Sequence, residues 1–136
     1  MNNIEKELLC NKRVRPCVLL LQSKYKGKQC KFVVPIRSNI NSKVPSEQFF
    51  LLPPNSTTKP NNIHGIHYIK IFPISNKYIQ KYRIENNDFM LGIKTIIDEN
   101  EKKIIEECQK YLLECEQGNK HPMTPDIDGI LLKVLG

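Results

Sequence analysis

The chain has 136 residues, of which 40% are hydrophobic and 26% charged, a composition that suits one globular domain over residues 1–136 and leaves little room for a second. The apolar runs are too short to span a bilayer and the first residues lack a signal-peptide pattern, so we expect a cytoplasmic protein with no membrane contact. Five cysteines without a Cys-x-x-Cys pair argue against a disulfide framework or a zinc site.

Charge is divided unevenly along the chain. The formal net charge is +7, but residues 1–84 carry 15 Lys and Arg against 3 acidic residues, whereas residues 85–136 carry 6 against 11. Such segregation indicates a cationic surface on one side of the molecule, suited to a polyanion such as nucleic acid. Solubility alone is the plainer interpretation of a positive charge, but it does not require segregation.

The first part of the chain favours β-structure. Residues 2–10 could form a short helix. Residues 16–22 and 29–35 then predict two strands of a hairpin with Gly27 in the turn, and a polar loop is expected over 37–46.

Two more strands are predicted before the helical region. Residues 47–53 indicate a third strand that ends at two prolines, and residues 55–62 are typical of a surface loop. Residues 65–74 alternate between apolar and other side chains, which predicts a fourth strand.

After residue 74 the hydrophobic period approaches 3.6. It predicts a short helix over 76–82 and a long helix from 87 or 88 to Gly118, which the polar stretch 98–103 can interrupt. The tail 124–134 has a helix-start pattern, with a short strand as the alternative. Strands followed by helices predict an α+β domain: a twisted antiparallel sheet or small half-barrel with peripheral helices and a helix-rich C-terminal half.

Cations and hydroxyls gather at the ends of the predicted hairpin strands. Arg15 precedes the first strand, and Arg37, Ser38 and Lys43 follow the second. Because hairpin partners run antiparallel, Arg15 and Ser38 are expected at the same edge, in a cluster suited to a phosphate. The plainer interpretation is a solvated loop that terminates two strands, and spacing alone favours it equally.

The sequence contains no glycine-rich phosphate loop and no paired aspartates in the strand region, so we expect neither a cofactor nor a metal. RNA can be cleaved without a metal, because its own 2′-hydroxyl attacks the adjacent phosphorus when the strand is held in line. Arg and Lys can stabilise the developing charge. The proton acceptor stays open among His64, His67 and Tyr68.

The stretch RPCVLLLQSKYKGKQCKFVVPIRSN resembles the N-terminal core of the ToxN/AbiQ family, the endoribonuclease toxins of type III toxin–antitoxin systems, including the CptN group. The resemblance implies a Kid/MazF-like small-barrel fold and metal-independent cleavage of mRNA that leaves 2′,3′-cyclic phosphate ends. It also implies a small folded RNA antitoxin that the toxin processes and that inhibits it, in an assembly of alternating protein and RNA subunits.

In this resemblance Ser38 falls on the family's active-site serine, and Arg15 falls on or near its basic position before the first strand. The family often has Ser-Pro-Lys where this chain has Ser38-Asn39-Ile40, so the lysine's role would pass to Lys43 or Arg37. Arg15, Ser38, Arg37 and Lys43 are therefore the predicted catalytic residues.

The predicted RNA-binding residues are the basic residues and strand-end polar residues of the same half: Lys12, Arg13, Lys24, Lys26, Lys28, Lys31, Asn39, His64, His67, Lys70, Lys77, Lys81 and Arg83. Two other functions fit the same sequence. One is a non-catalytic RNA-binding module that docks RNA by shape and phosphate contacts. The other is a protein-interaction domain in which the long helix binds a partner.

Overall fold

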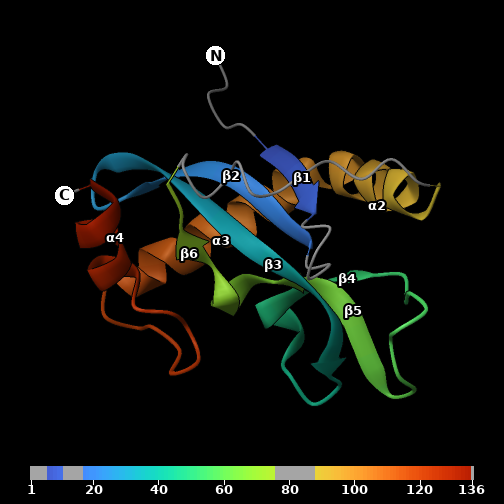
Figure 1. Ribbon diagram of the computed structural model, residues 1–136. Coiled ribbons are helices and arrows are strands. Elements are labelled where there is room, and N and C mark those ends of the chain that lie inside the picture. Colours follow the sequence, from blue (N-terminus) through green and yellow to red (C-terminus); the bar gives the residue numbers. More distant parts are fainter. Residues whose placement is uncertain (1–5, 11–16, 76–87, 136) are drawn as a thin grey trace.

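The protein is described by a computed structural model, which defines residues 6–10, 17–75 and 88–135. These residues form an α+β fold, in which a curled antiparallel sheet packs against helices that come mostly from the C-terminal half (Figure 1). The strands are β1 (Lys6–Cys10), β2 (Cys17–Tyr25), β3 (Lys28–Asn41), β4 (Phe49–Leu52), β5 (Asn62–His67) and β6 (Phe72–Pro73). The helices are α2 (Asp88–Glu99), α3 (Glu101–Glu116) and α4 (Ile127–Leu135), with short 3₁₀ turns η1 (Ser46–Gln48) and η2 (Tyr68–Lys70). The predicted fold class is confirmed.

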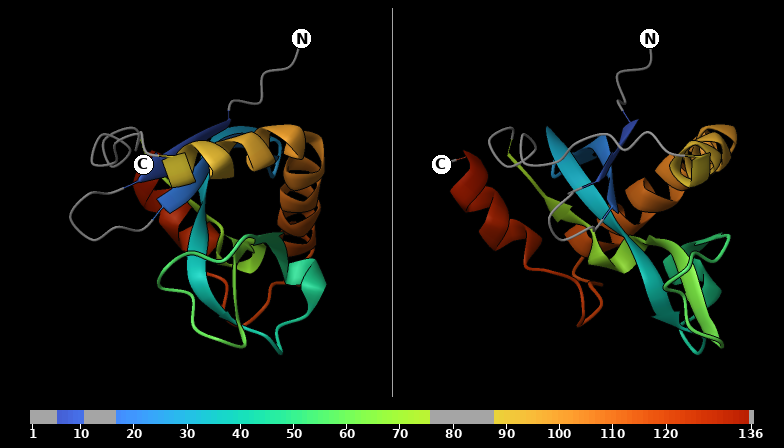
Figure 2. Two further views of the ribbon diagram at one scale, coloured as in Figure 1. Left: turned by 90° about the vertical axis from the view of Figure 1, so that its right-hand side faces the viewer. Right: turned by 45° about the vertical axis from the view of Figure 1, so that its right-hand side comes forward.

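The sheet has the strand order β1-β2-β3-β5-β4, and β6 also pairs with β3. Figure 2 shows how this sheet curls into a half-barrel, with α2 and α3 on its open side. None of the helices in the defined ranges has the length and hydropathy that a bilayer crossing requires.

The predicted hairpin is confirmed, and its strands are longer than expected. β2 pairs with β3 from Cys17 opposite Ile36 to Tyr25 opposite Lys28. Only Lys26 and Gly27 remain in the turn, with φ angles of 50° and 80°. Two central residues with positive φ match the right-handed twist of the flanking strands, and glycine adopts such angles without steric cost.

The expected polar loop over 37–46 is wrong in its first half, because β3 continues through Pro35 to Asn41. On one side of β3, residues Phe32 and Val33 pair with β6, and the segment from Ile36 onward pairs with β5. Pro35 lies between these two partners, so its missing N–H interrupts neither ladder.

The prediction of a single strand over 65–74 is also wrong. β5 begins earlier, at Asn62, and ends at His67, after which η2 separates it from β6. The consecutive residues Tyr68 and Ile69 are both buried. The turn lets β5 and β6 pair with different parts of β3, β5 from Ile36 onward and β6 at Phe32 and Val33.

Residues 6–10 form a strand rather than part of the short helix expected over 2–10. β1 pairs along the edge of β2, from Lys6 opposite Leu21 to Cys10 opposite Cys17. A helix of this length forms few hydrogen bonds after a costly nucleation, whereas the edge of β2 offers a complete ladder.

The long helical region is interrupted and ends where its sequence predicts. It divides at Asn100, inside the polar stretch, where the Asn100 side chain donates to the carbonyl of Ile96 at 2.8 Å. Gly118, at φ 86°, follows the end of α3, and the N–H of Asn119 bonds to the carbonyl of Glu114 at 2.9 Å. This is the usual glycine-terminated helix end.

The tail is a helix and not a strand, but it begins later than the Thr124–Pro125 pattern indicates. Asp126 precedes α4, and its carboxylate accepts the N–H of Gly129 at 3.2 Å. An aspartate at this position satisfies an N–H that the first turn leaves unpaired.

The main core lies between the concave face of the sheet and the helices. Alternate residues of β2 and β3 and one face of α3 supply most of it: Leu19, Leu21, Phe32, Val34, Ile104, Cys108 and Leu112. Cys108 and Cys115 are both buried and free. A second, smaller cluster of Val18, Leu20, Val33 and Ile74 lies on the other face of the sheet.

Candidate nucleic-acid interface

The predicted phosphate site falls on a β-bulge. Arg37 pairs with Gly65 and Ile40 pairs with Ile63, so β3 has one more residue than β5 between these pairs. The extra residue lies in the segment that contains Ser38 and Asn39. Bulges bend a strand and redirect its side chains, and they are frequent next to active sites.

Ser38 and Asn39 hold the loop between β4 and β5 against this bulge. The Ser38 hydroxyl accepts a hydrogen bond from the Asn55 side-chain amide at 2.7 Å. The Asn39 side chain donates to the Thr57 carbonyl at 3.0 Å and accepts the N–H of Lys59 at 2.8 Å. Asn39 is thus engaged within the protein, whereas Ser38, which accepts in this bond, keeps its O–H as a donor.

Three predicted residues meet near the bulge: Arg37, His67 and Lys70. Arg37 lies opposite Gly65, and His67, two residues along β5, lies on the same face of the sheet because strand side chains alternate. Arg37 and Lys70 are both close enough to lower the pKa of His67 electrostatically. We call Arg37, His67, Lys70 and the neighbouring His121 the bulge cluster.

His67 is buried and its ring is neutral at pH 7. The residue is 4% exposed, and within the described part of the chain neither ring nitrogen has a hydrogen-bond partner. Burial lowers the pKa of His67 to about 4, and the positive charges of Arg37 and Lys70 and the nearby His121 act in the same direction. Arg37 and Lys70 thus place positive charge beside the neutral ring of His67.

His121, which no sequence pattern indicates as a site residue, lies in the connection between α3 and α4. Its Nδ1 accepts the N–H of Met123 at 3.0 Å, and its own backbone N–H donates to the Tyr111 hydroxyl at 3.0 Å. A histidine in a connection between helices follows no hydrophobic period, so only the fold could bring it to His67.

His64 has a different environment from His67. It is buried, and its Nδ1 lies 2.6 Å from the carbonyl oxygen of Pro53, to which it donates. His64 thus fixes the chain at the end of β4. Among the residues that the structure describes, no three His, Cys, Asp or Glu side chains form a group that could hold a metal ion.

The predicted lysines of the hairpin lie at a distance from the bulge. Lys24, Lys26 and Lys28 are exposed at the hairpin tip, and Lys26 forms an ion pair with Asp128 at 2.9 Å. Nine residues of extended β3 separate Lys28 from Arg37, which corresponds to roughly 30 Å. Lys31 is half-buried within β3, and Lys43 is exposed in the turn that follows it.

Six predicted site residues lie outside the described ranges: Lys12, Arg13, Arg15, Lys77, Lys81 and Arg83. The predicted meeting of Arg15 with Ser38 therefore stays a prediction. The described register ends at Cys17 opposite Ile36, two residues after Arg15 and two before Ser38.

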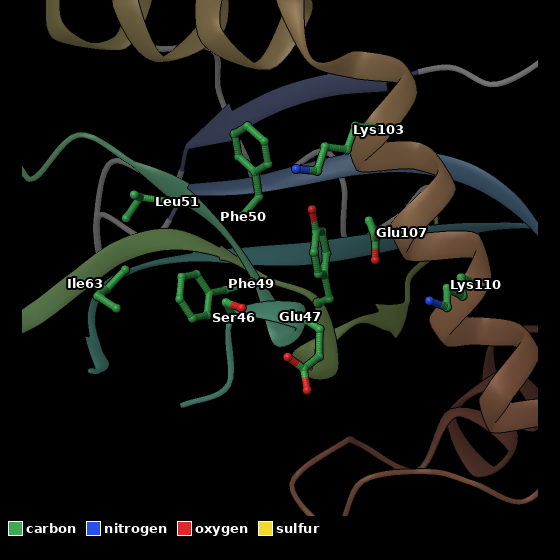
Figure 3. Close-up of a pocket in the computed structure, with 10 residues that line it drawn as sticks. Ser46, Glu47, Phe49, Phe50, Leu51, Ile63, Lys103, Glu107 and Lys110 are labelled. Carbon is green, nitrogen blue, oxygen red and sulfur yellow. The ribbon is translucent and has the colours of Figure 1, made fainter. Parts of the chain in front are cut away.

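A cavity of about 690 Å³ opens between β4 and α3 (Figure 3), and Phe49 in its lining pairs with His67 of the bulge cluster. Aromatic side chains of β4 and charged side chains of α3 face each other across it, among them Phe49, Phe50, Lys103, Glu107 and Lys110.

Exposed cations, a serine hydroxyl and a bulged strand are together suited to hold a phosphate group. Comparisons of the chain with protein-family profiles, with curated protein sequences and with solved structures gave no match.

Proposed function

We propose that the protein is a metal-independent endoribonuclease toxin of the ToxN/AbiQ kind. It cleaves mRNA and processes its own RNA antitoxin, and direct binding of that small folded RNA inhibits it in an assembly of alternating protein and RNA subunits. The curled antiparallel sheet agrees with the small-barrel fold that the resemblance implies. The surplus of Lys and Arg in residues 1–84 provides the charge that an RNA partner requires.

The observation that supports this proposal most directly is the register of the hairpin. Cys17 lies opposite Ile36, so the start of β2 lies beside the Arg37–Ser38 segment of β3. If the antiparallel register continues for two more residues, Arg15 is opposite Ser38. A guanidinium and a hydroxyl would then share one phosphate.

In the proposed reaction the 2′-hydroxyl oxygen of the RNA attacks the adjacent phosphorus. A bond forms between them and the bond to the 5′-oxygen breaks. The 2′-hydroxyl loses a proton and the 5′-oxygen gains one, so the products have a 2′,3′-cyclic phosphate and a 5′-hydroxyl. Arg15, Arg37 and Lys43 stabilise the negative charge that develops on the phosphate, and they do so without changing their protonation. The Ser38 hydroxyl donates to a phosphate oxygen and orients the strand.

Replacement of Ser38 tests the proposal. Ser38→Ala is expected to abolish the growth arrest caused by induced expression and to lower RNA cleavage by roughly 100-fold, the usual effect of losing one oxyanion donor. RNA affinity should stay within about threefold, because cations provide most of the binding. Ser42→Ala, at an exposed position in the following turn, is the control and should stay toxic.

Unchanged toxicity of Ser38→Ala would remove Ser38 from the mechanism. The hydrogen bond from Asn55 to Ser38 favours one other function, a non-catalytic RNA-binding module in which this serine only fixes the β4–β5 loop. That function predicts RNA binding without cleavage in the native protein, so an assay for cyclic phosphate ends separates the two.

A further inference from the structure

The cavity between β4 and α3 combines flat apolar surface with charge. Phe49, Phe50 and Leu51 line it from the strand side, and Figure 3 shows Lys103, Glu107 and Lys110 projecting from α3 on the other side. Its volume of about 690 Å³ is in the range of sites that enclose a small organic ligand.

Phe50 already has a cation near its ring. The ammonium of Lys103 lies 5.9 Å from the ring centroid, and Phe49 and Phe50 are only half-buried. Half-exposed aromatic rings beside a lysine are typical of surfaces on which unpaired bases stack while the cation holds the phosphate.

The charged residues of α3 are available for a ligand. Lys103, Glu107 and Lys110 are four and three residues apart, so they share one face of the helix. Within the described ranges, Glu107 forms no ion pair with either lysine at 4.0 Å or less. On the α3 side the cavity therefore presents one carboxylate between two cations, and Glu47 adds a second carboxylate to the lining from η1.

Tyr68 adds a buried polar atom to the lining. The residue is 3% exposed, and its hydroxyl has no hydrogen-bond partner among the described residues. Burial raises the pKa of Tyr68, and the negative charge of Glu107 raises it further, so the hydroxyl stays protonated. An unpaired buried hydroxyl is costly, and a ligand that bonds to it would remove the cost.

We propose that this cavity binds an unpaired guanine nucleotide of RNA; the biological source of that nucleotide rests on the proposed function. Guanine presents two adjacent N–H donors, N1–H and the N2 amino group, to the two oxygens of Glu107, and its O6 can accept from the Tyr68 hydroxyl. Adenine and cytosine have an acceptor nitrogen beside their single amino group. A carboxylate oxygen and this nitrogen repel each other. The base stacks on Phe50, and Lys103 and Lys110 bind its phosphate.

This assignment is tested by titrating the protein with 5′-GMP and with 5′-AMP. The NMR chemical shifts of the α3 amides report binding. We expect 5′-GMP to bind about tenfold more tightly than 5′-AMP, as one bidentate contact to a base edge provides. Glu107→Gln should remove this preference, and Glu106→Gln, which changes an exposed neighbour outside the lining, should keep it.

The lysines provide a second, independent pair of variants. Lys103→Ala should weaken binding of both nucleotides several-fold, because it removes a phosphate contact and the cation beside Phe50, and Lys102→Ala should not. Circular dichroism of each variant confirms folding. Equal binding of the two nucleotides, or equal behaviour of Glu107→Gln and Glu106→Gln, would overturn the guanine site.

The same samples separate this inference from the nuclease proposal. A protein that prefers 5′-GMP in a manner dependent on Glu107 but cleaves no RNA has the guanine site and is not an endoribonuclease. A protein whose RNA cleavage depends on Ser38, but which binds 5′-GMP no more tightly than 5′-AMP, is a nuclease without this site.

Discussion

At the scale of single residues, His67 shows how the fold changes the chemistry of a side chain. Its ring is buried beside Arg37 and Lys70, and both ring nitrogens lack partners among the described residues. A proton on this ring would be buried and close to two positive charges, so its pKa falls from 6.5 to about 4.

This environment predicts how stability depends on pH. Between pH 6.5 and pH 4 the unfolded chain protonates His67 and the folded chain does not, so the free energy of unfolding should decrease as the pH is lowered through this window. The loss attributable to His67 is at most about 3 kcal/mol, and below about pH 4 both states are protonated and the loss ends.

Urea unfolding of the native protein and of His67→Leu, measured at several pH values, checks this prediction. The variant should be at least as stable at pH 7, because it removes two unpaired nitrogens, and its advantage should grow toward pH 4. A difference between the two proteins that is independent of pH would contradict the account of His67.

Some site residues could be predicted from the sequence and others could not. The hairpin brings Arg37 and Ser38 beside the start of β2, and this follows from a local pattern, whereas their inclusion in β3 and its bulge does not. His121 and Glu107 reach their sites through contacts with segments more than 40 residues away, and nothing in their own neighbourhood indicates those contacts. Arg37 and His67 come together only through the β3–β5 pairing.

At the scale of elements, the pairing of β4 with β5 depends on a close backbone approach at Gly65. A Cβ atom at this position would lie 2.6 Å from the carbonyl oxygen of Phe50, in the neighbouring strand. Strand β4 carries the aromatic side chains of the cavity, so this approach also positions the proposed guanine site.

Gly65→Ala should therefore destabilise the protein, by roughly 1–3 kcal/mol, the usual cost of forcing extra atoms into a packed site. Gly92→Ala is the matched control: this glycine is exposed in α2 with no atom within 4 Å of an added Cβ, and alanine there should stabilise by about 0.5–1 kcal/mol. Chemical denaturation measures both changes. Equal stability of the two variants would show that the approach at Gly65 is not required.

Elements with strong local signals could be predicted, and those that depend on neighbouring strands could not. Gly27 between two apolar runs identified the hairpin, and the polar stretch with Gly118 identified the break and the end of the long helical region. The division of residues 65–74 by η2 has no local signal. It arises because β5 and β6 pair with different parts of β3. The same holds for β1, which forms because β2 has a free edge.

At the scale of the whole molecule, charge and fold together support an RNA partner. The sheet is built almost entirely from residues 1–84, which carry most of the Lys and Arg, and the helices come from residues 85–136, which carry most of the acidic residues. The segregation along the sequence thus becomes a segregation between the sheet and the helices. A folded RNA that binds the sheet side would displace many counterions, so its affinity should fall steeply with salt concentration.

The most direct test of the central claim is to purify the protein after expression from its native operon at low salt and to extract the bound nucleic acid. The account predicts a short RNA of uniform length, with 2′,3′-cyclic phosphate ends, that is released as the salt concentration rises. Purification of a correctly folded protein with no RNA, or with RNA of mixed lengths, would contradict it.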